Sequence, residues 1–165
     1  MRHVTSQNHT GSTERRLKMP DYHLVAGVLI EKEKDYVLVQ EGKEHVRGQW
    51  NIPAGSIEEG EDPKDAAKRE TLEEAGVEAE LEGLAGVFFD DSDYLDATVI
   101  VIVFHSEVPG NYVLKPEEGE EILETGAFTK EEIKEKDLRT PFILDAIENV
   151  QNNRTEGLKA VKDYR

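Results

Sequence analysis

Residues 55 to 77 read GSIEEGEDPKDAAKRETLEEAGV, and this stretch carries more structural information than any other in the chain. Asp62 is a favourable N-cap, and Pro63 suits the first helical position, where its missing N–H is not needed. The residues that follow are mostly good helix formers up to Ala75, and Gly76 is typical of the position just after a helix. The sequence therefore predicts a glycine-containing loop followed by a helix from Pro63 to Ala75.

Three glutamates gather on the last turns of this helix. Glu70 and Glu74 are four residues apart, so their carboxylates lie one above the other, and Glu73 lies beside them. Like charges at this spacing destabilise a helix by roughly 0.2–0.5 kcal/mol. Two interpretations follow. The glutamates form a solvated acidic face, or they hold a divalent cation such as Mg²⁺ or Mn²⁺, which prefers carboxylate and carbonyl oxygens.

The spacing of the whole stretch favours the second interpretation. Its fixed positions are Gly55, Glu61, Arg69, Glu70, Glu73, Glu74 and Gly76. This pattern resembles the signature of the Nudix (MutT-like) hydrolase family at every polar and glycine position. The one departure is Thr71, which stands in an aliphatic slot, and a β-branched threonine can pack there.

The rest of the chain predicts a sheet with helices between its strands. Apolar, partly β-branched runs and strand signals lie at 23–31, 36–40, 77–89, 97–108 and 123–128. A capping box at Thr129 and Glu132 begins a short helix, and Thr140-Pro141 begins a last amphipathic helix. This order resembles the Nudix-type α/β/α sandwich, an α/β fold with a mixed β-sheet, over residues 21–152.

The segments outside this core carry weaker signals. Residues 1–20 are polar and aperiodic, so we expect a flexible N-terminal arm, and we expect residues 153–165 to form a loose C-terminal tail. Residues 41–62 form a long loop, and long ordered loops in compact domains are usually functional. Within it, Trp50 is expected to anchor the loop in the core rather than to stack on a base.

The resemblance implies a reaction and a cofactor. Nudix enzymes cleave the diphosphate linkage of a nucleoside diphosphate-linked or nucleotide substrate by water attack on phosphorus, with Mg²⁺ or Mn²⁺. Glu70, Glu73 and Glu74 would hold the metal together with a backbone carbonyl near Gly55. Bound divalent cations neutralise charge on phosphate oxygens and make water nucleophilic, so the chemistry agrees with this carboxylate set.

The resemblance also implies catalytic roles. Arg69 would orient Glu70 or Glu73 by a charge-assisted contact, and Glu61 would hold the loop to the helix. The general base would be a signature glutamate or a glutamate of the acidic loop before 123–128. In that loop we choose Glu121, and the alternative is that the loop is simply solvated.

Two further residues are candidates for substrate contact. Arg47 suits bidentate phosphate binding, and Tyr94 lies near the place of a tyrosine in some dinucleoside-polyphosphate hydrolases of the family. Each could instead be an ordinary surface residue. The proline typical of ADP-ribose hydrolases is absent from 91–93, and residues 38–61 are similar to members that cleave oxidised nucleoside diphosphates or triphosphates. The sequence therefore leaves the substrate open.

Two rival functions use the same fold. A catalytically silent nucleotide-binding sensor would lack one or more signature glutamates, and all of them are present here. An isomerase of the isopentenyl diphosphate type would need a cysteine, and the chain has none. We therefore expect a hydrolase and keep the sensor as the alternative.

Composition excludes several other classes. Without cysteine there is no disulfide or thiol nucleophile, and scattered histidines such as His23 and His105 predict structural roles rather than a zinc site. The net charge of −16 disfavours nucleic acid as a partner. No apolar run reaches the roughly 18 to 20 residues of a membrane span. The sequence predicts a cytoplasmic protein with a small-molecule, nucleotide-type substrate, and it leaves a homodimer open.

Overall fold

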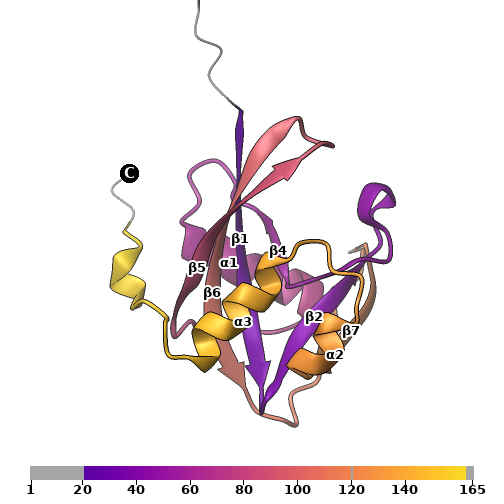
Figure 1. Cartoon of the computed structure of the whole chain (residues 1–165), viewed down its shortest axis with the longest axis vertical. Coiled ribbons are helices and arrows are strands. Elements are labelled where there is room, and N and C mark those ends of the chain that lie inside the picture. Colours follow the sequence, from indigo (N-terminus) through magenta and orange to yellow (C-terminus); the bar gives the residue numbers. More distant parts are fainter. Residues whose placement is uncertain (1–20, 120, 163–165) are drawn as a thin grey trace, which may run out of the picture.

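The computed structural model of the chain describes residues 21–119 and 121–162, so the predicted N-terminal arm at 1–20 lies outside the described residues. The strands are β1 (Tyr22–Lys32), β2 (Asp35–Glu41), β3 (Trp50–Asn51), β4 (Ala54–Ser56), β5 (Gly83–Ser92), β6 (Ala97–Val108) and β7 (Ile122–Phe128). The helices are α1 (Pro63–Ala75), α2 (Lys130–Lys134) and α3 (Phe142–Gln151), with 3-10 turns η1 (Glu44–Val46) and η2 (Leu158–Ala160). Figure 1 shows their arrangement.

All seven strands join one mixed sheet. The central pair, β1 and β6, is parallel and stays in register from Tyr22↔Thr98 to Lys32↔Val108. The other pairings are antiparallel, and the order along the sheet is β3-β2-β1-β6-β5, with β4 on β1 and β7 on β2. The other edge of β1 is divided. Val25, Ala26 and Gly27 pair with β4, and only the last two residues of β1 pair with β2.

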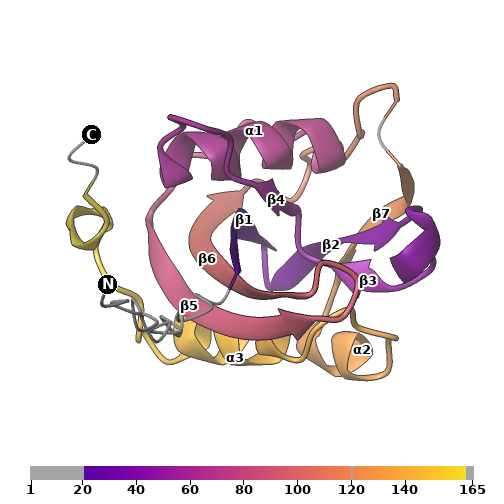
Figure 2. The same ribbon diagram turned by 90° about the horizontal axis from the view of Figure 1, so that it is seen from above.

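The sheet lies between two helical layers, as Figure 2 shows with α1 on one side and α2 and α3 on the other. Side chains of a strand alternate between the two faces. On β1, Val28 and Ile30 therefore pack in the core under α1, whereas Leu29 packs in the core under α3. The predicted α/β/α sandwich with a mixed sheet is confirmed.

Helix α1 begins and ends as predicted. Asp62 Oδ1 accepts a hydrogen bond from the Lys64 N–H (2.8 Å), and Gly76 adopts the left-handed conformation at φ 68°. The face toward the sheet is built from small side chains, which are Ala66, Ala67, Thr71 and Ala75, all fully buried. Thr71 fills its aliphatic slot by donating its hydroxyl to the Ala67 carbonyl (2.7 Å). Small residues allow the helix to approach β1 and β4 closely.

Two segments differ from the prediction. Residues 77–82 form no strand, and β5 begins only at Gly83. Residues 153–162, predicted as part of a loose tail, run beside the sheet: Glu156 pairs with Leu84, and Leu158 packs against the core under α1. Trp50 is buried and packs edge-on against Phe128, which confirms its predicted role as an anchor. No helix in the described part of the chain is long and apolar enough to cross a membrane.

Candidate active site

Arg69 ties the loop before α1 to the helix itself. Its guanidinium donates to both carboxylate oxygens of Glu61 (2.8 and 2.9 Å) and to the Ser56 carbonyl (3.0 Å). The same group contacts Glu70 (2.6 Å) and Glu73 (3.3 Å). Because the Arg69–Glu61 pair is bidentate and charge-assisted, it fixes both the loop and the plane of the guanidinium. Through these contacts Arg69 joins Glu61 of the loop to Glu70 and Glu73 of the helix.

Strand β4 touches two of the three signature glutamates. The Ala54 N–H donates to Glu74 Oε2 (3.0 Å), and the Glu74 side chain is almost fully buried. The Gly55 backbone lies directly against the Glu70 carboxylate, because a Cβ added at Gly55 would overlap that group. Any larger residue at position 55 would therefore displace the Glu70 carboxylate where β4 meets α1.

Burial changes the acidity of these carboxyls. Burial raises the pKa of Glu74 to about 8, although the Ala54 N–H opposes the shift, and nearby Glu41 adds to it. Burial also raises the pKa of Glu70, against the opposing effect of Arg69. In contrast, the hydrogen bonds from Arg69 lower the pKa of Glu61. The helix thus holds carboxylates that are costly to keep ionised without a nearby cation.

The donor set fits a hard divalent cation. The carboxylates of Glu70, Glu73 and Glu74 and the Gly55 carbonyl are all oxygen donors, as Mg²⁺ prefers. The space beside Gly55 that a Cβ would fill is shared with the Glu70 carboxylate. In the structure, Glu70 and Glu73 both turn toward Arg69, and Glu74 turns toward Ala54, so the three carboxylates do not converge on one point.

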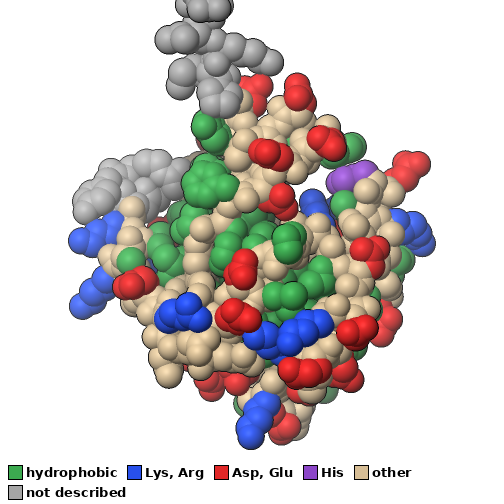
Figure 3. All heavy atoms as spheres, in the orientation of Figure 1, with side chains coloured by type: hydrophobic (Ala, Val, Ile, Leu, Met, Phe, Trp, Pro, Cys, Tyr) green, Lys and Arg blue, Asp and Glu red, His purple; other side chains and the backbone are tan. Residues whose placement is uncertain are grey.

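A cleft of about 580 Å³ opens beside this helix. It is lined by the start of β1, by β4, by η1 and by the β5–β6 hairpin, and Glu70 is the signature glutamate that reaches it. Two cations, Lys43 and Arg139, face five carboxylates in the lining, which are Glu58, Glu70, Asp90, Asp91 and Asp93. Figure 3 shows acidic side chains at the tip of the hairpin.

Among the residues predicted to contact the substrate or to act as the base, Tyr94 lines the cleft, whereas Arg47 and Glu121 do not. Tyr94 lines the cleft and stacks on the ring of His45, with centroids 3.9 Å apart. Arg47 is exposed, donates to the Gly42 carbonyl (2.9 Å) and is not among the residues that line the cleft. Glu121 is also exposed and outside this lining, and its backbone carbonyl accepts from the Gly42 N–H (2.6 Å).

Sequence reasoning missed a buried acid next to the site. Glu41 is 1% exposed, and its Oε1 accepts from Arg139 Nη1 (2.7 Å). Asn51 Nδ2 approaches the same oxygen (3.4 Å). Glu41 is the last residue of β2, and Arg139 lies 98 residues later, shortly before α3. No local sequence pattern therefore links the two residues. Their pairing places Arg139 at the wall of the cleft.

The substitution Arg139→Met is expected to lower the free energy of unfolding by about 2 kcal/mol. It leaves the buried Glu41 carboxylate without its cation, and the partial exposure of Arg139 keeps the loss below that of a fully buried pair. Urea unfolding measures the change. Arg154→Met, at an exposed arginine, is the matched control and should change stability by less than about 0.5 kcal/mol. Equal midpoints for Arg139→Met and wild type would contradict the role of the pair.

The substitution Gly55→Ala is expected to reduce turnover by about 100-fold while the protein still folds. The added methyl group overlaps the Glu70 carboxylate, and a displacement of about 1 Å in a site can cost this much. Steady-state kinetics and circular dichroism test both parts. Gly157→Ala is the control, because a Cβ there meets nothing within 4 Å. Wild-type turnover in Gly55→Ala would show that the contact between Gly55 and Glu70 has no catalytic importance.

The chain is similar in sequence to known proteins. A family model described as NUDIX domain matches residues 21–148. The 8-oxo-dGDP phosphatase NUDT18 of Homo sapiens is 39% identical over 72 residues, which are 44% of this chain and 22% of that protein. The diphosphoinositol polyphosphate phosphohydrolase NUDT4B of Homo sapiens is 35% identical over 78 residues, 47% of this chain and 42% of that protein. The chain thus spans less than half the length of these relatives.

Among solved structures, a NUDIX hydrolase from Nitrosomonas europaea superimposes with a TM-score of 0.75 at 27% sequence identity. The match covers 87% of this chain and 98% of that chain. The similarity therefore includes both the sheet and the helices that cover it.

Proposed function

Because the chain belongs to the NUDIX domain family, we propose that it is a Mg²⁺-dependent pyrophosphohydrolase that cleaves the diphosphate linkage of a nucleotide-type substrate. One observation carries this proposal. All three signature glutamates are present on α1: Glu70 lies against the Gly55 backbone at the wall of the cleft, Glu74 accepts the Ala54 N–H, and Arg69 contacts Glu70 and Glu73. A binding module without catalysis would have no need for every member of this set.

The residues of the site divide into three roles. Glu70, Glu73 and Glu74, with the Gly55 carbonyl, would hold Mg²⁺ or Mn²⁺, which when bound neutralises charge on the phosphate oxygens and activates water. Arg69 positions Glu70 and Glu73 through its contacts of 2.6 and 3.3 Å. Lys43 and Arg139 lie in the cleft lining, where their positive charges would bind the phosphate oxygens of the substrate.

We propose that the attacking water gives its proton to Glu70 rather than to Glu121. Glu70 lines the cleft, whereas Glu121 is exposed and outside the lining. Water then attacks one phosphorus in line, and the other phosphate leaves with the electron pair of the broken P–O bond. A Glu121→Gln variant that loses turnover as strongly as Glu70→Gln would contradict this choice.

The charge of the cleft narrows the substrate class. Its lining holds two cations and five carboxylates, so it does not suit a ligand that carries many phosphates around one ring. A nucleoside diphosphate compound carries fewer phosphates and presents a base that can pack on aromatic side chains. The stacked rings of Tyr94 and His45 in the cleft lining support such a contact. We therefore place the substrate among nucleoside diphosphate compounds.

The proposal is tested by a substrate panel with Mg²⁺ and with Mn²⁺, followed by detection of phosphate products. The panel contains 8-oxo-dGDP, ADP-ribose, a dinucleoside polyphosphate and a diphosphoinositol polyphosphate. We expect turnover of a nucleoside diphosphate compound that is abolished by EDTA and restored by Mg²⁺. Tight binding of one compound without turnover of any would favour the sensor. Preference for the diphosphoinositol compound would contradict the argument from charge.

We further propose that the protein acts in the cytoplasm on this small molecule, without a nucleic-acid or membrane partner. The net charge of −16 supports the exclusion of nucleic acid. Cell fractionation tests the location, and light scattering measures whether the chain forms a homodimer.

A further inference from the structure

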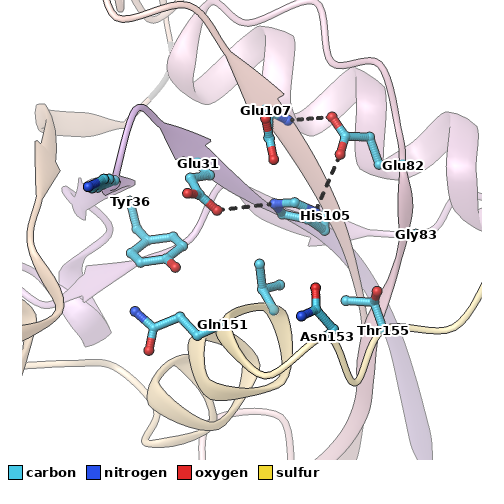
Figure 4. Close-up of a pocket in the computed structure, with 11 residues that line it drawn as sticks. Glu31, Tyr36, Glu82, Gly83, His105, Glu107, Gln151, Asn153 and Thr155 are labelled. Atoms are coloured by element: carbon cyan, nitrogen blue, oxygen red, sulfur yellow. Dashed lines mark hydrogen bonds and ion pairs between the residues drawn. The ribbon is translucent and has the colours of Figure 1, made fainter.

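A second cluster of metal-ligating side chains lies at the other end of the β1–β6 pair from the candidate active site. The ligand atoms of Glu31, His105 and Glu107 all lie within 4.8 Å of one another. Across the described ranges 21–119 and 121–162, these residues form the one group of three or more that meets this distance. Figure 4 shows Glu31, His105 and Glu107 around a shared pocket of about 570 Å³.

Strand register explains why these residues meet. The parallel pairing places Glu31 beside Glu107 and Leu29 beside His105. His105 and Glu107 are two residues apart on β6, so their side chains lie on the same face of the sheet. The candidate active site involves the first half of β1, where β4 pairs, whereas Glu31 lies near the end of the strand. The cluster is therefore separate from the signature glutamates.

One ring nitrogen of His105 makes no hydrogen bond within the described part of the chain. The residue is 7% exposed, and its Nε2 is buried with no hydrogen bond among the described residues. The nearest carboxylate oxygen, Oε2 of Glu31, is 3.7 Å away, which is too far for a hydrogen bond. An unsatisfied buried polar group costs about 1–3 kcal/mol, so a ligand at this position would remove a penalty.

The other ring nitrogen faces a carboxylate that is held in place. Nδ1 of His105 lies 3.8 Å from Glu82 Oε2, and Glu82 Oε1 accepts the backbone N–H of Glu107 (3.2 Å). Figure 4 shows Glu82 and Glu31 on opposite sides of the imidazole. A histidine that binds a metal through one nitrogen usually points the other at a carboxylate or carbonyl. Here Nδ1 of His105 faces the Glu82 carboxylate, at a distance longer than a hydrogen bond.

The charges around the pocket favour a cation. Three carboxylates, those of Glu31, Glu82 and Glu107, line it together with one lysine, Lys34. The end of α3 also contributes to the lining, and a helix C-terminus carries a partial negative charge. A bound cation would relieve the repulsion between these negative charges.

We propose that Glu31, His105 and Glu107 form a second cation site, which takes a divalent first-row transition metal such as Zn²⁺. One imidazole nitrogen with two carboxylates suits zinc, whereas Mg²⁺ prefers oxygen ligands alone. Two ligands of a tetrahedral zinc ion lie roughly 3.3 Å apart, so the 3.7 Å between Nε2 and Glu31 requires only a small movement. The scattering of the histidines along the chain predicts no zinc site. The proposed site at Glu31, His105 and Glu107 replaces that expectation.

Isothermal titration calorimetry of the untagged full chain with Zn²⁺ tests the site. Excess Mg²⁺ is added to fill the all-oxygen site proposed on α1. We expect one Zn²⁺ per chain, bound about tenfold or more weakly by His105→Gln and by Glu107→Gln. Glu107 is exposed, so its substitution does not threaten folding. Wild type, but not these variants, should unfold at a higher temperature when Zn²⁺ is added.

Controls separate this site from the other places where zinc could bind. The remaining histidines are changed in His3→Gln, His9→Gln, His23→Gln and His45→Gln, and Glu70→Gln removes a carboxylate of the active site. All five should keep wild-type zinc affinity. Equal affinity of wild type, His105→Gln and Glu107→Gln would overturn the proposal, as would a loss of binding in Glu70→Gln alone or no binding by wild type.

Discussion

Substitution of Glu70 by glutamine is expected to reduce turnover by about 10²- to 10⁴-fold without unfolding the protein. Glutamine keeps the volume of the side chain and an oxygen that can accept from Arg69, so the packing against Gly55 survives. It removes the negative charge that would bind the cation and take the proton from water. Thermal stability without metal should stay the same or rise, because burial disfavours the charged form of Glu70.

Steady-state kinetics on the best substrate of the panel, with Mg²⁺, measures the loss. Glu80→Gln is the matched control, since this glutamate is exposed and lies outside the candidate site, and it should keep wild-type kinetics. Wild-type turnover in Glu70→Gln would mean that the reaction is centred elsewhere.

The second large effect is a loss of stability as the pH rises. The pKa of Glu74 is about 8 in the folded protein and about 4.5 in an unfolded chain. Between these values the folded protein holds a proton that the unfolded chain has lost, so the free energy of unfolding falls as pH increases. The slope approaches about 1.4 kcal/mol per pH unit, and the total is on the order of 5 kcal/mol.

Urea unfolding in EDTA at several pH values between 5 and 9 tests this linkage, with Glu74→Gln as the comparison. The variant cannot ionise, and its side-chain oxygen can still accept the Ala54 N–H. Its stability should therefore depend less steeply on pH than that of wild type, and its excess over wild type should grow from pH 5 to pH 8. Parallel curves for the two proteins would show that Glu74 does not govern the pH dependence.

The elements that sequence predicts well are those fixed by neighbours in the chain. The limits of α1 follow from Asp62, Pro63 and Gly76, and its small-residue face follows from helical spacing. The capping box at Thr129 and Glu132 is likewise local, and both of its hydrogen bonds are present. The fold class could be predicted because the signature and the order of elements resemble one family.

The parts that sequence did not predict depend on contacts between distant segments. Glu74 was predicted on the acidic face of its helix, but β4 covers it and supplies a hydrogen bond from Ala54. Glu41 and Arg139 meet only because the end of β2 lies beside the segment before α3. His105 and Glu107 were read as part of an ordinary strand, since their neighbour Glu31 is supplied by register alone. Helical and strand periodicity contain no information about such pairs.

The parallel pairing of β1 with β6 also sets an order of events during synthesis. Each paired residue of β6 lies 76 residues after its partner on β1, as in Tyr22↔Thr98. Contacts this distant close a long loop and are typical of slowly folding chains. When β4 and α1 have left the ribosome, β6 has not yet been made, although it pairs with β1 along the whole length of that strand. Helix α1 therefore lies against an incomplete sheet until β6 is made. The core that covers the buried face of α1 is completed late.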